Sequence, residues 1–269
     1  MTSENFKKWN LILGWGTFAI ALITYSLTLE PTVSAWDCGE YISTSVKLEV
    51  GHPPGAPLFQ MLGAFFAMFS SELTEIAKMV NFMSALASAF TILFMFWSVT
   101  ILLSNLVKKN DTLNKNNQIA ILGSAVVASL TFAFTDSFWY SAVEAEVYAM
   151  AAFIMSVLFY AGLRWEGEMF TPRGDKWVVL IAFVIGLSFG VHFMGLLTIP
   201  AIGFLYFFKN YNKVTVKNFL IANVVTVAIL LFIFKLLLPM TLRFFSAAEI
   251  FFVNQINMPF NSGTIIAGL

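Results

Sequence analysis

Charged residues are scarce in this 269-residue sequence, at 11% of the chain against roughly 25% in a soluble domain, while 59% of the residues are hydrophobic. No soluble fold of this length could hide so much apolar surface, so the composition predicts an all-α integral membrane protein. A lone cysteine, Cys38, excludes an internal disulfide. A formal net charge of zero gives no general attraction to nucleic acid. There is also no zinc-ligand cluster, P-loop or dinucleotide fingerprint.

Uncharged runs predict the membrane spans, because a crossing helix needs roughly 20 mostly apolar residues. The run at 177–208 is too long for one helix, and Lys235 interrupts the last run. The runs are residues 11–29, 79–103, 119–134, 149–163, 177–208 and 218–239.

The loops predict an orientation, because lysine and arginine are retained on the cytoplasmic side. A cytoplasmic N-terminus places eleven of the 15 basic residues inside and ten of the 15 acidic residues outside. Residues 177–208 must then cross twice, with a turn near residues 190–192. Residues 57–69 must not cross, and are predicted to form a helix in the outer interface. The prediction is seven spans and a first outer loop at residues 30–78 that carries interfacial helices.

The predicted organisation is a membrane module at residues 1–239 followed by an outer segment at 240–269. The last residues read like the opening of a further apolar helix, as in a truncated protein. At the other end, Lys7 and Lys8 before an apolar run loosely resemble a cleaved signal peptide. That run is longer than a typical signal sequence, so we expect it to be retained as a span.

Asp37 and Glu40 are the first candidates for chemistry, because a helix would place residues three apart on one face, together with Tyr41 and Thr44. Paired carboxylates suit base catalysis. An alternative is a capping box in which Ser34 caps a helix and Asp37 is its fourth member. His52 follows in the proline-rich segment HPPGAP at 52–57, which either fixes the imidazole in place or acts only as a rigid elbow.

A second outer loop, residues 136–148, has three acids, no bases and several aromatic residues. An aromatic belt at the membrane surface explains Asp136. Glu144 and Glu146 lie closer to membrane depth, and the sequence leaves two interpretations open for them: solvated acids of the same belt, or functional residues. His192 is either functional or a neutral histidine packed between helices. Lys235 and Arg243 would bind either lipid phosphate or a phosphate within a cleft.

Four motifs together resemble one family: WDCGEY at 36–41, GHPPGAP at 51–57, VEAEVY at 143–148 and GVH at 190–192. This is a membrane family of Bacteroidota first described as a domain of unknown function. It has a vertebrate relative that is an endoplasmic-reticulum protein O-mannosyltransferase, and it is similar to the glycosyltransferase C superfamily. The resemblance covers essentially the whole chain.

The resemblance implies a seven-helix module that transfers a sugar, expected to be mannose, from a polyprenyl phosphate to serine or threonine of a translocated protein. It implies a bacterial inner-membrane protein with its active face in the periplasm. Asp37 matches the position of the superfamily's catalytic acid, with Glu40 as its support. The other residues expected to bind donor, sugar or phosphate are Tyr41, His52, Glu144, Glu146, His192, Lys235 and Arg243.

No metal and no cofactor besides the lipid-linked donor are expected, although two acids and a histidine could hold one ion. The expected partners are the donor, a protein acceptor and membrane lipid, with a larger complex also open. Two other classes of function remain at this point. One is a transporter or flippase, which would also use buried acids and a broken helical hairpin. The other is a noncatalytic subunit of an envelope complex.

Overall fold

The computed structural model describes residues 3–110, 114–211 and 213–269, and within them it contains helices and no strand. Two compact units are present, one ending at Leu205 and the other running from Tyr206 to Leu269. Six helical stretches are long and apolar enough to cross a membrane: Glu4–Leu27, Leu73–Val107, Lys115–Ala133, Val147–Glu168, Phe193–Asn210 and Val216–Gln255. The all-α membrane class is therefore confirmed.

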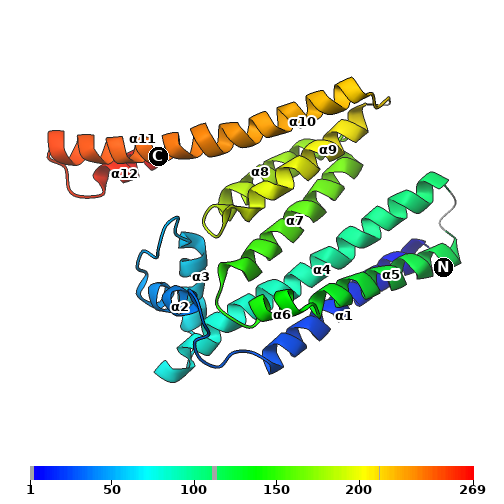
Figure 1. Ribbon diagram of the computed structural model, residues 1–269, viewed down its shortest axis with the longest axis horizontal. Coiled ribbons are helices and arrows are strands. Elements are labelled where there is room, and N and C mark those ends of the chain that lie inside the picture. Colours follow the sequence, from blue (N-terminus) through cyan, green and yellow to red (C-terminus); the bar gives the residue numbers. More distant parts are fainter. Residues whose placement is uncertain (1–2, 111–113, 212) are drawn as a thin grey trace. The chain divides into compact units, whose positions relative to one another are not determined.

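The first unit is built around α4 (Figure 1), which packs against α1, α5 and α7. Alanines at 85 and 89 of α4 meet Ala21 and Tyr25 of α1, and such small side chains let helices in a membrane approach closely. The helices up to residue 210 are α1 (Ser3–Leu27), α2 (Cys38–Lys47), α3 (Pro57–Ala67), α4 (Ile76–Asn110), α5 (Lys115–Ala133), α6 (Asp136–Ala142), α7 (Val147–Glu168), α8 (Gly174–Ser188) and α9 (Thr198–Asn210).

The predicted hairpin within residues 177–208 is present. Helix α8 ends at Ser188, the chain turns, and the 3₁₀-helix η2 (Phe193–Leu197) leads into α9. At 15 residues, α8 extends only about 22 Å. Six stretches are long enough to count as spans, whereas the charge pattern predicts seven. The difference is α8, which is too short to be counted.

Helix α3 agrees with the prediction that residues 57–69 do not cross. It has 11 residues and is about 17 Å long, well short of a bilayer core. Phe59, Gln60 and Gly63 form its buried face, whereas Met61 and Phe65 are more than half exposed. An apolar face that remains exposed suits a helix lying in the interface.

Alternating helix directions place the first outer loop, the second outer loop and the α8–η2 turn at one end of this unit, hereafter the Asp37 end (Figure 1). The N-terminus of α1 and the C-terminal ends of α4 and α7 lie at the opposite end.

The second unit consists mainly of one long helical run, and the predicted division at residue 239 stays a prediction. Helix α10 (Val216–Leu231) continues through the π-helix η3 (Phe232–Leu237) into α11 (Leu238–Ile250) and the π-helix η4 (Phe251–Gln255). Pro239 occupies the start of α11, directly after the wider π turn, so its missing N–H and its ring are accommodated without a break. The terminal apolar residues form α12 (Ser262–Gly268), which packs on α11.

Candidate active site

Hydrogen bonds join the loops of the Asp37 end, although they are far apart in the sequence. The backbone N–H of Glu30 donates to the carbonyl of Val143 at 3.1 Å. The N–H of Leu58, in the first turn of α3, donates to the carbonyl of Gly190 at 2.7 Å. A Cβ on Gly190 would lie 2.7 Å from the Leu58 Cβ, so this contact requires glycine. The three loops therefore form one surface.

Asn81 of α4 anchors the start of the first outer loop. Its fully buried Nδ2 donates to the carbonyls of Glu30 at 2.8 Å and Thr32 at 2.9 Å. Its Oδ1 lies 3.9 Å from the buried thiol of Cys38. Asn81 was not among the residues predicted from the sequence, where the available signal was an amide side chain within an otherwise apolar span.

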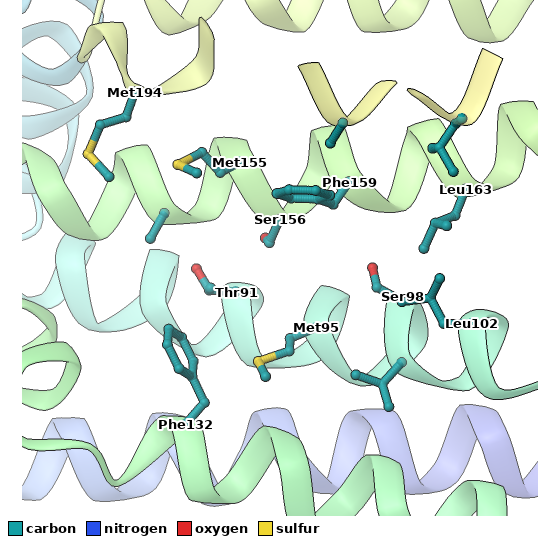
Figure 2. A pocket seen from close by; sticks show the side chains of 14 residues that line it. Thr91, Met95, Ser98, Leu102, Phe132, Met155, Ser156, Phe159, Leu163 and Met194 are labelled. Atoms are coloured by element: carbon teal, nitrogen blue, oxygen red, sulfur yellow. The ribbon is translucent and has the colours of Figure 1, made fainter. Parts of the chain in front are cut away.

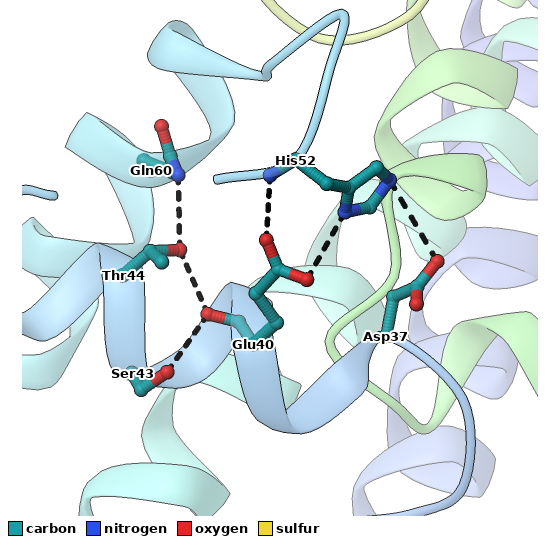
Figure 3. A network of polar contacts seen from close by, with 6 residues as sticks. All are labelled: Asp37, Glu40, Ser43, Thr44, His52 and Gln60. Atoms are coloured by element: carbon teal, nitrogen blue, oxygen red, sulfur yellow. Dashed lines mark hydrogen bonds and ion pairs between the residues drawn. The ribbon is translucent and has the colours of Figure 1, made fainter. Parts of the chain in front are cut away.

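Asp37, Glu40 and His52 form a compact cluster (Figure 3). His52 Nδ1 lies 3.1 Å from Glu40 Oε2, and the backbone N–H of His52 donates to Glu40 Oε1 at 2.6 Å. His52 Nε2 lies 3.8 Å from Asp37 Oδ2. The carboxylate of Glu40 therefore contacts both the backbone N–H and the ring Nδ1 of His52. The second ring nitrogen, Nε2, is turned toward Asp37.

The capping-box interpretation of this segment is wrong. Helix α2 begins at Cys38, and the side chain of Asp37 makes no capping hydrogen bond. The hydroxyl of Ser34 donates instead to Glu144 of the second outer loop. The Asp37 side chain is 55% exposed and is thus available to a ligand.

Charges within the cluster reinforce one another. The hydrogen bonds from His52 lower the pKa of Glu40, and the same ring contact raises the pKa of His52. Two neighbouring carboxylates favour the cationic form of a histidine. The cluster could also hold a metal ion, because ligand atoms of Asp37, Glu40 and His52 all lie within 4.8 Å of one another. The absence of a metal stays a prediction.

The buried ring of Tyr41 packs between His52 of the cluster and Phe59 of α3. Its ring centre lies 5.8 Å from that of His52 and 5.2 Å from that of Phe59. Burial, followed by the nearby carboxylates, raises the pKa of Tyr41 to about 12, so the phenol keeps its proton. Beside it, buried Gln60 Nε2 donates to Thr44 Oγ1 at 2.9 Å, which ties α3 to α2.

Glu144 and Glu146 are both buried, at 5% and 7% exposed. Burial is the largest cause that raises the pKa of Glu146 to about 7, and the charges of Glu144 and Asp37 add to it. Glu146 is therefore close enough to Asp37 for their charges to interact. An aromatic belt with solvated acids does not describe these two residues.

His192 has a local structural role. Its Nδ1 accepts the backbone N–H of Met194 at 3.2 Å at the start of η2, and its ring centre lies 5.5 Å from that of Tyr148. Burial lowers its pKa, which favours the neutral ring.

Lys235 and Arg243 belong to the second unit, where Lys235 lies in η3 and Arg243 in α11. Their predicted phosphate contacts, like the substrate contacts of the other candidates, stay predictions.

Two apolar cavities flank the contact between α4 and α7. One, of about 340 Å³, adjoins α3 and α8, and is lined by Leu58, Leu62, Met83, Met150 and Leu187 among others. The other, of about 560 Å³, lies between α4 and α7 further along the helices, with Met95, Met155 and Phe159 in its wall (Figure 2). Their linings suit hydrocarbon chains.

Two proteins of the same name are among the known proteins that this chain resembles. The protein O-mannosyl-transferase tmem260 of Dictyostelium discoideum is 24% identical over 208 residues, which is 73% of this chain and 23% of that protein. The protein O-mannosyl-transferase TMEM260 of Mus musculus is 27% identical over 171 residues, which is 64% of this chain and 22% of that protein. The chain thus matches less than a quarter of the length of these relatives. No solved structure matches. The model of the protein O-mannosyl-transferase TMEM260 N-terminal domain matches residues 37–215, and the chain belongs to that family.

Proposed function

We propose that this chain is the catalytic membrane module of a glycosyltransferase that moves mannose from a polyprenyl phosphate to serine or threonine of a protein acceptor. The observation that carries the proposal is the gathering of Asp37, His52 and Glu146 from two loops at one end of a bundle of membrane-spanning helices. Exposed ion pairs contribute little to folding stability, so stability alone does not explain the His52 cluster. The expected location is a bacterial inner membrane, with this end facing the periplasm.

In the proposed reaction, the acceptor hydroxyl oxygen attacks C1 of the sugar. The bond from C1 to the phosphate oxygen breaks, and polyprenyl phosphate leaves as an anion. The hydroxyl proton passes to the carboxylate of Asp37, which acts as the general base. A single displacement of this kind inverts the anomeric centre.

His52 supplies the complementary charge. Glu40 occupies its Nδ1, so Nε2 is the ring nitrogen left to face a ligand beside Asp37. A protonated imidazole there donates a hydrogen bond to the departing phosphate, where negative charge develops. Glu40 is thus a positioning residue that keeps His52 protonated and aimed. The buried acids Glu144 and Glu146 would bind sugar hydroxyls.

The apolar cavity beside α3 is the proposed site for the first isoprene units of the donor. Leu58 and Leu62 in its wall come from α3, whose Gln60 is bonded to Thr44 of α2, one turn beyond Glu40. A lipid tail in this cavity would place its phosphate near the cluster. The first unit therefore contains apolar and ionic sites suited to a lipid-linked donor.

The direct test is reconstitution of the chain in lipid nanodiscs with labelled polyprenyl-phosphate mannose. We expect label on a serine- or threonine-containing acceptor and, because water can replace the acceptor, slow release of free mannose without it. Movement of intact labelled lipid across proteoliposome membranes with neither product would instead favour a transporter. Intact donor with no movement would favour a noncatalytic subunit.

Replacement of Glu40 by glutamine is expected to lower kcat roughly 10- to 100-fold, because small misplacements of positioned groups have effects of this size. Loss of the carboxylate also lowers the pKa of His52. Since the proposal needs His52 protonated, the activity of Glu40→Gln should begin to fall at a lower pH than that of the wild type. Glu49→Gln, on an exposed acid of the same loop, is the control. An unshifted pH profile would contradict the role given to Glu40.

A further inference from the structure

A polar cavity lies at the opposite end of the first unit from Asp37. It encloses about 760 Å³ between α1, α4 and α7. Each of the three helices contributes polar side chains, and these are Lys7, Asn10, Thr100, Ser104, Asn105, Tyr160, Arg164 and Glu168. The two apolar cavities described above have no charged side chain in their linings, so this one suits a different kind of ligand.

Arg164 is held rigidly in the wall of this cavity. Its Nη1 donates to the Tyr160 hydroxyl at 3.0 Å and its Nη2 to Glu168 Oε1 at 3.1 Å. Its guanidinium carbon lies 5.3 Å from the ring centre of Trp177, whose Nε1 donates to Glu168 Oε2 at 3.1 Å. These bonds use two of the five N–H donors of an arginine. The side chain is still 40% exposed, so a preorganised guanidinium faces the cavity.

Positive charge continues from Arg164 into an adjoining cavity of about 280 Å³, which is also lined by Arg173 and Lys176. Across the two linings, four basic residues stand against one acid, Glu168. The whole chain has only 15 basic residues, so this is a concentration of positive charge. A fixed guanidinium with neighbouring cations is the arrangement that recognises phosphate.

We propose that these two cavities bind the phosphate headgroup of an anionic glycerophospholipid from the leaflet opposite to the Asp37 end. Arg164 would contact the phosphate, with Lys7, Arg173 and Lys176 around it. The position favours a lipid over a soluble anion, because the cavities lie where α1 begins and α7 ends, at the depth of headgroups. Phe6, Leu11 and Leu163 in the same lining offer apolar surface for the acyl chains.

The test is retention of lipid by the full chain in nanodiscs with and without phosphatidylglycerol, measured by native mass spectrometry after release into detergent. We expect phosphatidylglycerol to be retained in preference to phosphatidylcholine. The double variant Arg173→Ala/Lys176→Ala should reduce that preference about tenfold, since each basic residue near a membrane contributes to anionic-lipid binding. This variant leaves Arg164 and its packing intact, and its melting temperature shows whether the fold is kept.

The matched control is Lys213→Ala/Lys217→Ala, which removes two charges that line neither cavity. The proposal is overturned if this control weakens retention equally, because the effect would then be one of total charge. It is also overturned if the two lipids are retained alike. Displacement of bound lipid by millimolar inorganic phosphate, with the same dependence on Arg173 and Lys176, would assign the site to a soluble anion. None of these readouts depends on glycosyl transfer.

Discussion

Asp37→Asn is expected to reduce transfer from polyprenyl-phosphate mannose by about 10²- to 10⁴-fold in kcat, the usual contribution of a general base. Asparagine keeps the shape of the side chain but cannot accept the proton of the acceptor hydroxyl. Folding should be little affected, because the Asp37 side chain is 55% exposed and makes no capping bond. The measurement is single-turnover transfer in nanodiscs, together with the melting temperature of the variant.

Asp136→Asn is the matched control, since Asp136 is an exposed acid of the second outer loop at the same end of the bundle. It should transfer mannose at the wild-type rate. If Asp37→Asn keeps normal turnover while its fold is intact, Asp37 is not the base. Equal loss in both variants would point to the general negative charge of this surface.

Glu146→Gln is expected to remove a dependence of stability on pH. The pKa of Glu146 is raised from 4.5 to about 7 in the folded protein. Between these values the folded protein holds a proton that the unfolded chain has lost, so the free energy of unfolding falls as pH rises through this interval. Glutamine is neutral at every pH and should keep its stability at pH 8.

The measurement is the melting temperature of both proteins in detergent across the interval from pH 5 to pH 8. The wild type should lose several degrees more than Glu146→Gln. Glu49→Gln serves as the control, because Glu49 is exposed and its replacement should leave the pH dependence of the wild type unchanged. Parallel curves for wild type and Glu146→Gln would show that Glu146 is not the group that titrates.

Span boundaries were predicted less well than span positions. Helix α4 starts three residues before the uncharged run at 79–103 and ends seven residues after it. Charged residues mark the edge of the hydrocarbon, whereas a helix ends where its backbone hydrogen bonds end, and a helix can continue into the headgroup region. The same reasoning explains why the helical run of the second unit passes Pro239.

The candidate site was predicted residue by residue but not as an arrangement. The spacing of Asp37 and Glu40 predicted that they would act together, and they do meet, but through His52. Nothing in the spacing shows that Glu40 bonds both the backbone and the ring of His52, because that contact depends on the turn at 51–56. Asn81 was missed because its partners are backbone carbonyls of a distant loop.

By itself, the sequence determined that the chain is a helical membrane protein, where its apolar helices lie, and which few polar residues could carry chemistry. These properties follow from local composition and from the cost of placing charge in hydrocarbon. Only the tertiary structure decided which of those polar residues meet. The pairing of Ser34 with Glu144, the closeness of Glu146 to Asp37 and the contact of Leu58 with Gly190 all join segments that lie far apart in the chain. Such contacts arise from the packing of α4 with α1 and α7, and no local pattern encodes them.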